Sequence, residues 1–156
     1  MKIIIRIILY LVIWGFAFLT YSCAPEACLE VTESFLNASL YNNTSKKKES
    51  PDSLTLYGLN HETNKLYNKT EGVQPALLPL DQSADSCSFI IRINGITDTI
   101  TFRYTNRPHL ISKECGYAIY HNIIDTPFYT KNAIDYIYTA SRNITTVNEE
   151  NIRIFY

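Results

Sequence analysis

The sequence predicts an all-β protein: a single antiparallel β-sandwich of about seven or eight strands, immunoglobulin-like in architecture, after a helical N-terminal signal segment. Three observations support this prediction. Short segments alternate apolar with polar residues, and β-branched and aromatic residues dominate them. Turn-forming Asn, Gly and Pro residues separate these segments. Beyond residue 28, the helical spacing of apolar residues is hard to find.

The first residues carry the pattern of a secretory signal. Lys2 and Arg6 precede an unbroken apolar run over residues 7–19, which is shorter than the ~20 residues that a membrane-spanning helix needs. A single-pass anchor is the alternative, but it would bury both cations in the bilayer. The predicted division of the chain is a lipoprotein signal peptide at 1–22, a short tether at 23–27 and a β-sandwich domain at 28–156.

Cys23 is the predicted lipidation site. The small residues Ser22 and Ala24 flank it, as in bacterial lipoprotein signals, although Thr20 stands where such signals usually carry leucine. Ordinary cleavage nearby, which leaves Cys23 as a plain thiol, is the alternative. No acidic run follows the cysteine. We therefore expect a lipoprotein of the cell envelope, anchored in the outer membrane and facing the periplasm.

The charge balance argues against nucleic acid as a partner. Removal of residues 1–22 takes two of the 14 basic residues and none of the 15 acidic ones. Twelve basic residues then face 15 acidic ones, which gives the mature chain a net charge of −3. A nucleic-acid-binding domain would instead present a basic face.

The first half of the domain contains three predicted strands. Apolar and polar residues alternate over residues 28–41 and again over 53–59, and a polar, lysine-rich loop at 42–52 separates the two segments. Residues 60–72 are rich in turn formers. The short apolar segment 76–80 contains a proline, which places it at a sheet edge because proline cannot donate a ladder hydrogen bond.

The clearest element is a β-hairpin. Residues 87–93 and 96–104 are joined by Asn94-Gly95, a dipeptide that tolerates the positive φ angles of a two-residue turn. The resulting register places three pairs on one face: Ile93 with Ile96, Phe89 with Ile100, and Cys87 with Phe102.

Asp98 is the exception on this face, since the same register places it opposite Ile91. Two interpretations follow. Either Asp98 accepts hydrogen bonds from loop amides near the end of the sandwich, or a bulge shifts the register.

Four further segments complete the predicted sandwich. Residues 110–113 follow Pro108, and residues 117–124 and 132–140 alternate in the manner of strands. The last segment is 147–156. Its alternation places Ile152, Ile154 and Tyr156 on one side of the strand, and Arg153 and Phe155 on the other.

Three cysteines remain if Cys23 is acylated, and an oxidising compartment favours their pairing. We expect a disulfide between Cys28 and Cys115, which ties the start of the first strand to the middle of the domain. Cys87 is then a buried free thiol. Pairing of Cys28 with Cys87, or two disulfides without a lipid, are the alternatives.

Several short motifs resemble those of small Bacteroidota lipoproteins of the domain-of-unknown-function 6452 family. The matching pieces are a signal that ends in cysteine, Ala27-Cys28-Leu29, Leu54-Thr-Leu-Tyr-Gly58, Leu78-Pro79-Leu80, residues 93–102, Ser112-Lys-Glu-Cys-Gly116, and residues 150–154. The resemblance supports the Cys28–Cys115 pair, because both positions resemble recurrent family cysteines, whereas Cys87 looks like an addition of this chain. It implies location and architecture only, because no activity is known for the family.

No established catalytic motif occurs in the sequence. His61, His109 and His121 are isolated from one another, whereas a zinc site needs three or four converging ligands. Nothing cationic flanks Cys87, which argues against a reactive thiolate. We therefore expect neither an enzyme nor a bound metal or cofactor.

The function that these observations favour is that of a non-catalytic lipoprotein that binds another envelope protein. Its exposed faces and the loop at 42–52 would carry the contact. The alternative is a glycan-binding module that uses the rings of Tyr117, Tyr136 and Tyr138, although alternating aromatic residues more often pack within a sheet. An envelope hydrolase is the third candidate, and the sequence pairs no nucleophile with a base for it.

Overall fold

The computed structural model of the protein describes residues 28–156; the predicted signal peptide, Cys23 and the tether lie outside them. Eleven strands and no helix occur in the described part, which confirms the all-β prediction. In chain order the strands are β1 (Phe35–Tyr41), β2 (Leu54–Gly58), β3 (Lys65–Thr70), β4 (Ala76–Pro79), β5 (Ser86–Ile93), β6 (Ile96–Ser112), β7 (Gly116–Ile123), β8 (Phe128–Tyr129), β9 (Tyr136–Thr139), β10 (Asn143–Ile144) and β11 (Ile152–Phe155). Within residues 28–156 no helical segment has the length and hydropathy that a bilayer crossing requires.

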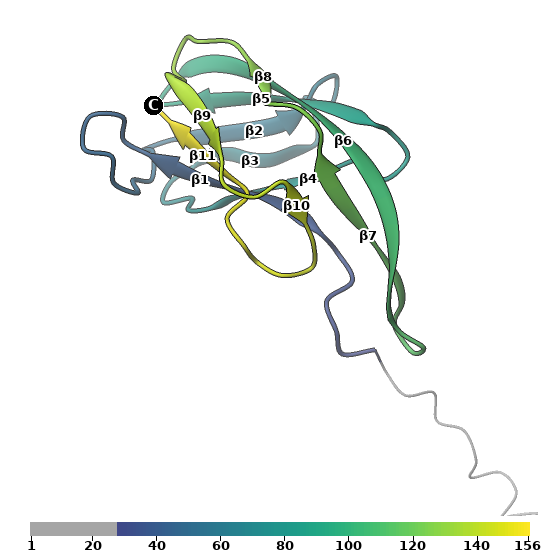
Figure 1. The fold of residues 1–156 in the computed structure, drawn as a ribbon. Coiled ribbons are helices and arrows are strands. Elements are labelled where there is room, and N and C mark those ends of the chain that lie inside the picture. The colour runs from purple at the N-terminus through teal and green to yellow at the C-terminus, as the bar shows by residue number, and fades with distance from the viewer. Residues whose placement is uncertain (1–27) are drawn as a thin grey trace, which may run out of the picture.

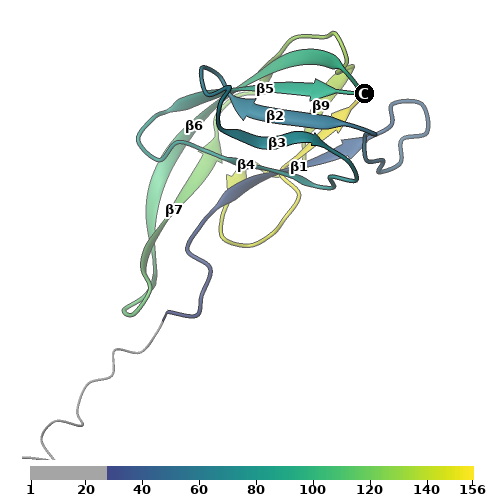
Figure 2. The same cartoon turned by 180° about the vertical axis from the view of Figure 1, so that it is seen from behind.

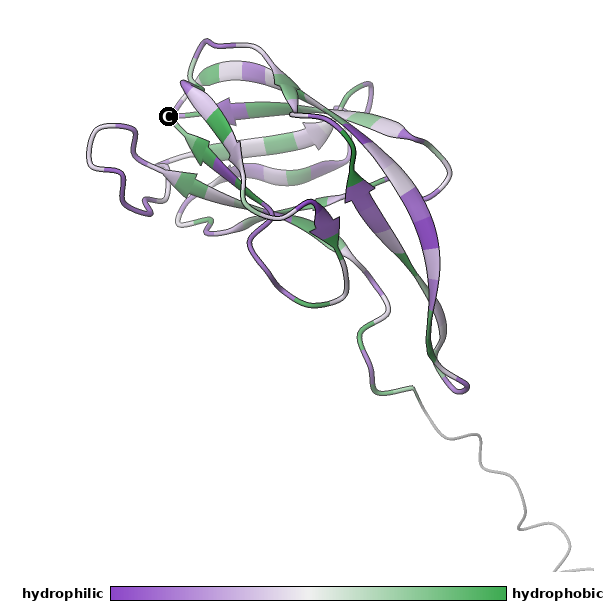
Figure 3. Cartoon of the chain, viewed as in Figure 1, coloured by the Kyte–Doolittle hydropathy of each residue, from purple (hydrophilic) through white to green (hydrophobic). Residues whose placement is uncertain are grey.

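The strands form two sheets that face each other across the core (Figures 1 and 2). One sheet has the order β4-β1-β11-β9. The other has the order β10-β7-β6-β5-β2-β3, and β8 pairs with β6. Strand β4 and the first half of β6 turn alternate side chains inward, and Figure 3 shows hydrophobic and hydrophilic residues alternating along the strands.

One neighbouring pair, β1 and β11, runs parallel, contrary to the expectation of a purely antiparallel sandwich. The sequence pattern does not report strand direction, because parallel and antiparallel strands share the same two-residue period. A parallel pair requires a long connection, and the more than 100 residues between these two strands supply it.

The predicted β5–β6 hairpin is confirmed residue by residue. Ile93 pairs with Ile96, and every further pair back to Ser86 with Arg103 keeps the register. Asn94 and Gly95 adopt φ angles of 49° and 90°, the positive values that a two-residue hairpin turn requires.

Asp98 keeps this register and is 1 % exposed. Its Oδ1 accepts hydrogen bonds from Thr130 Oγ1 at 2.5 Å and from the backbone N–H of Asn132 at 2.9 Å. Its Oδ2 accepts the N–H groups of Ala133 and Ile134 at 2.7 and 2.9 Å. The first of the two interpretations is therefore confirmed: Asp98 holds the loop before β9 against the sandwich.

Strand β6 continues straight through Pro108, where the sequence suggested a new segment after the proline. Beyond Arg103 the strand has left β5 and pairs only with β7. Pro108 has no N–H to donate, and on the side of β6 away from β7 no neighbouring strand of the described chain is present that would accept one. The paired residues 105–112 and 116–122 form a projecting two-stranded hairpin, here called the arm (Figure 1).

The disulfide between Cys28 and Cys115 is confirmed, with a Cα–Cα distance of 4.8 Å. Cys115 lies at the tip of the arm, between β6 and β7. Further along the chain, the hydroxyl of Ser34 donates to the carbonyl of Ile119 at 2.5 Å. Residues 28–34 are therefore attached to the arm at both ends before the chain enters β1.

Three short strands lie where the sequence indicated turns or loops. β3 occupies part of the predicted turn region at 60–72, and most of its residues are exposed. It is an edge strand with irregular pairing to β2, so it has no buried face to impose an alternation. β8 and β10 have two residues each, too few for any periodicity to be read.

Candidate functional site

The outer side of the four-stranded sheet gathers aromatic and charged side chains near one end of the molecule. The inner residues of β1 and β11 pack in the core, so Tyr41, Arg153 and Phe155 point outward. The loop after β1 and the segment before β11 add further charges. This surface, here called the cationic aromatic face, consists of Tyr41, Lys46, Lys48, Tyr136, Tyr138, Glu150, Arg153 and Phe155.

The register of three neighbouring strands aligns the aromatic rings in one row. Tyr41 of β1 is the partner of Phe155 in β11, which is the partner of Tyr136 in β9. The rings of Tyr136 and Phe155 are stacked, with centroids 4.2 Å apart and planes 13° apart. Tyr41 lies 5.0 Å from Phe155 on the other side. Three rings on adjacent strands thus lie in one row, in which Phe155 is covered and only 7 % exposed, whereas Tyr136 is 37 % exposed.

Cations lie over these rings. Lys46 Nζ is 4.9 Å from the Tyr136 centroid and 5.2 Å from that of Phe155. The Arg153 guanidinium lies between two tyrosines, 5.6 Å from each of the Tyr41 and Tyr138 centroids. Each contact falls within the ~6 Å range in which a ring face attracts a cation.

Glu150 binds two cations of this face and one of the tyrosines through its carboxylate. Its carboxylate contacts Lys48 Nζ at 3.1 Å and Arg153 Nε at 2.5 Å, and it accepts the Tyr41 hydroxyl at 3.0 Å. Burial opposes ionisation, but hydrogen bonds from Ser39, Arg153, Lys48 and Tyr41 outweigh it and hold the pKa of Glu150 at about 2. The face therefore carries three cations and one carboxylate that stays ionised at neutral pH.

The loop between β1 and β2 is ordered by its own hydrogen bonds. The side-chain oxygen of Asn42 accepts the backbone N–H groups of Thr44 and Ser45, each at 2.9 Å. A β-bridge joins Tyr41 to Lys48, and the hydroxyl of Tyr136 accepts a hydrogen bond from Lys46 Nζ at 3.3 Å. The predicted binding loop and two of the predicted binding tyrosines therefore form one surface.

The third predicted tyrosine lies elsewhere. Tyr136 and Tyr138 share the outward side of β9 and are 37 % and 53 % exposed. Tyr117 lies near the tip of the arm, at the opposite end of the molecule from the β1–β2 loop (Figures 1 and 2). A single platform built from all three rings is therefore wrong, because β7 and β9 belong to different sheets.

Phe155, Arg153, Glu150 and Tyr41 belong to this surface but were not among the predicted site residues. A signal for two of them was present, since the alternation in the last segment places Arg153 and Phe155 together, opposite the apolar isoleucines. Their meeting with Tyr41 and Tyr136 depends on strand order, which alternation does not report.

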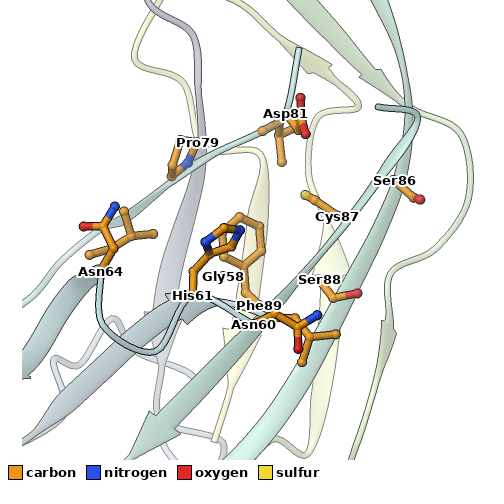
Figure 4. Close-up of a pocket in the computed structure, with 13 residues that line it drawn as sticks. Gly58, Asn60, His61, Asn64, Pro79, Asp81, Ser86, Cys87, Ser88 and Phe89 are labelled. Atoms are coloured by element: carbon orange, nitrogen blue, oxygen red, sulfur yellow. The ribbon is translucent and has the colours of Figure 1, made fainter. Parts of the chain in front are cut away.

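A cleft of about 550 Å³ lies between the β2–β3 turn and the start of β5. Figure 4 shows its walls, with His61 from the turn and Cys87 from β5. Cys87 is free, and it is half-buried rather than fully buried as expected. Burial raises the pKa of its thiol, against weaker opposing hydrogen bonds, so the group is a protonated thiol and a poor nucleophile at neutral pH.

His121 is the one histidine in the interior of the described chain, and it is 3 % exposed. Its Nδ1 lies 2.6 Å from Oδ1 of Asn106, and burial lowers the pKa of the imidazole. The ring is therefore neutral at pH 7. Across residues 28–156 no three His, Cys, Asp or Glu side chains gather in the manner of a metal site.

Comparison with known proteins identifies a family but no activity. No curated protein and no solved structure is detectably similar to the chain. One family model matches residues 53–156, which include every strand from β2 to β11. Cys28, β1 and the β1–β2 loop lie before the matched region. The chain belongs to the family of unknown function DUF6452.

Proposed function

We propose that this protein is a non-catalytic lipoprotein, anchored in the outer membrane through acylated Cys23 and facing the periplasm, that binds another envelope protein. The cationic aromatic face is the observation that carries the proposal. It combines the exposed rings of Tyr136 and Tyr138 with three cations, on a chain whose net charge after removal of the signal is −3. Aromatic residues and arginine are enriched at protein interfaces.

The chemistry of the face favours a partner segment with carboxylates and apolar side chains. Lys46 and Lys48 extend from an ordered loop, so less side-chain and loop entropy is lost when a partner binds. Glu150 neutralises part of the charge of Lys48 and Arg153, which leaves Lys46 as the cation without a carboxylate among the residues of the face. We therefore expect Lys46 to dominate recognition of an acidic group.

Cross-linking in intact cells tests this function. A photoreactive amino acid replaces Tyr138, and mass spectrometry identifies the cross-linked protein and the state of Cys23 together. A Lys46→Glu variant in the same background should lose the cross-link. Lys65→Glu is the matched control, because Lys65 is an exposed lysine on β3 in the other sheet. Equal cross-linking in both variants would contradict the proposed site.

A glycan-binding module is the second candidate, and the exposure of Tyr136 and Tyr138 on one side of an edge strand favours it. Sugars stack on exposed aromatic faces, and Tyr138 is 53 % exposed although the Arg153 guanidinium lies 5.6 Å from its ring centroid. Binding to a glycan array that disappears in a Tyr138→Ala variant would support this function over protein binding.

A further inference from the structure

The tip of the arm carries apolar side chains that the rest of the described chain leaves exposed. Leu110 and Tyr117 are cross-strand partners there, and they are 51 % and 67 % exposed. Leu29 and Val31, on the segment attached to the arm, are 93 % and 62 % exposed. Figure 3 shows hydrophobic residues near the lower end of β6 and β7. These four residues are here called the apolar tip.

The covalent structure places the apolar tip close to the predicted lipid. Cys28 lies five residue-to-residue steps after Cys23, and each step spans at most ~3.6 Å, so the two Cα atoms lie within about 18 Å of each other. Cys28 is bonded to Cys115 at the tip of the arm. Acyl chains on Cys23 would therefore hold the tip at the surface of the bilayer that they enter.

We propose that the apolar tip inserts into the interface of the phospholipid bilayer that holds the lipid on Cys23, so that the arm supports the sandwich above the membrane. This inference rests on the proposed lipid anchor. Leucine side chains suit the acyl boundary of a bilayer, and tyrosine is enriched at the level of the headgroups.

The charges around the tip indicate which force drives the contact. Lys113 is the cation of the turn, whereas Glu30, Glu33 and Glu114 are carboxylates on or beside it. Such a surface does not favour anionic lipid, so burial of apolar area carries the contact. We therefore expect contact with zwitterionic phosphatidylcholine, with little dependence on salt.

The arm also determines which surface faces away from the membrane. The β1–β2 loop and the arm tip lie at opposite ends of the molecule in both views (Figures 1 and 2). With the tip on the bilayer, Lys46 and the aromatic row point away from the lipid. The lysines of the loop then meet a partner in the space beyond the membrane.

The test uses the lipoprotein purified from membranes and reconstituted into phosphatidylcholine vesicles, with or without bromine on the acyl chains. Trp14 is the only tryptophan and lies in the predicted signal peptide, so a Leu110→Trp variant of the mature chain carries a single tryptophan. Ile96→Trp is the matched control. Ile96 and Leu110 are each 51 % exposed and lie near opposite ends of β6, about 46 Å apart along the strand at ~3.3 Å per residue.

The expected result is a shift of the Leu110→Trp emission to shorter wavelength and loss of roughly half or more of its intensity in brominated lipid. The Ile96→Trp emission should be the same in both lipids. A Tyr117→Trp variant should repeat the quenching from the facing strand. Equally weak quenching of all three variants overturns the inference. A blue shift without bromine quenching, together with cross-linked dimers, also overturns it, since a second copy would then cover the tip.

Mass spectrometry of the same preparation distinguishes a missing lipid anchor from a missing contact of the tip with the membrane. If Cys23 carries no acyl chain, the proposed anchor fails and the membrane contact fails with it. If Cys23 is acylated and the tip is not quenched, the anchor stands and only the tip contact is overturned.

Discussion

Replacement of Asp98 by asparagine removes one charge from the interior and leaves the shape of the side chain almost unchanged. Asp98 is 1 % exposed, and its two oxygens accept hydrogen bonds from the Thr130 hydroxyl and from three backbone N–H groups, at 2.5–2.9 Å. These donors belong to residues 130–134, which lead into β9. The variant therefore tests whether one carboxylate holds this loop.

The expected cost follows from the number of donors. Asparagine has one acceptor oxygen and one NH₂ group, so whichever way its amide turns, at least one buried backbone N–H faces another donor. A buried donor without an acceptor costs about 1–3 kcal/mol, and hydrogen bonds to a charged group contribute about 1.5–3 kcal/mol each. We expect the free energy of unfolding to fall by about 3 kcal/mol, a large share of the ~5–15 kcal/mol typical of a domain.

Urea unfolding followed by circular dichroism at several pH values measures this difference. Burial alone would raise the pKa of Asp98, but the hydrogen bonds from Thr130, Ala133, Asn132 and Ile134 outweigh it and lower the pKa. A lowered pKa means that the stabilisation is complete at neutral pH and is lost as the pH falls below the unfolded value of ~3.9 toward the folded one. The gap between the native protein and Asp98→Asn should therefore narrow in acid.

Asp125→Asn is the matched control. Asp125 forms an ion pair with Arg103 at 3.1 Å, but both side chains are more than half exposed, so we expect a change within about 1 kcal/mol. Equal small losses in the two variants, or a gap for Asp98→Asn that does not depend on pH, would refute the assigned role of the buried carboxylate.

Three further predictions concern other parts of the domain. Reduction of the Cys28–Cys115 disulfide should raise hydrogen exchange in the arm more than in the core. The free energy of unfolding should fall by no more than about 4–5 kcal/mol, the chain-entropy value for an 87-residue separation. An equal rise in exchange throughout the described chain would contradict this. Glu150→Gln should lower the free energy of unfolding by about 1–2 kcal/mol at pH 7. Because the pKa of Glu150 is held at about 2, this loss should fade between pH ~4.3 and 2, and a constant difference would speak against the ion cluster. Cys87 should react with iodoacetamide more slowly at pH 8 in the folded protein than in urea, since burial raises the pKa of its thiol; equal rates would show an unshielded group.

The elements that the sequence predicted well are those with local causes. The β5–β6 hairpin depends on a two-residue turn and on side chains close in the chain, so both register and facing pairs could be read before the structure. The same register placed Asp98 on the apolar face and left two interpretations, hydrogen bonds from loop amides or a bulge, between which the structure decided.

The elements that were missed or misplaced depend on distant partners. β3 exists because β2 offers it an edge, although its own side chains are mostly exposed. β6 passes through Pro108 because no strand lies on its other side there. The parallel pairing of β1 with β11 joins nearly opposite ends of the described chain.

The candidate site shows the same division. Alternation along the last strand placed Arg153 on the same side as Phe155, and alternation in β9 placed Tyr136 with Tyr138. That these residues meet Lys46 is a property of strand order and loop position. The separation of Tyr117 from the other two tyrosines has the same origin.

By itself, the sequence determined the all-β class, the hairpin register, the buried face of most strands and the family resemblance, because side-chain period and turn chemistry act over a few residues. Only the tertiary structure decided the order of the strands, the parallel pairing of β1 with β11, the projecting arm and the union of rings and cations on one face. These features arise from contacts between segments far apart in the chain, and a pattern that repeats every two residues does not specify which distant strand becomes a neighbour.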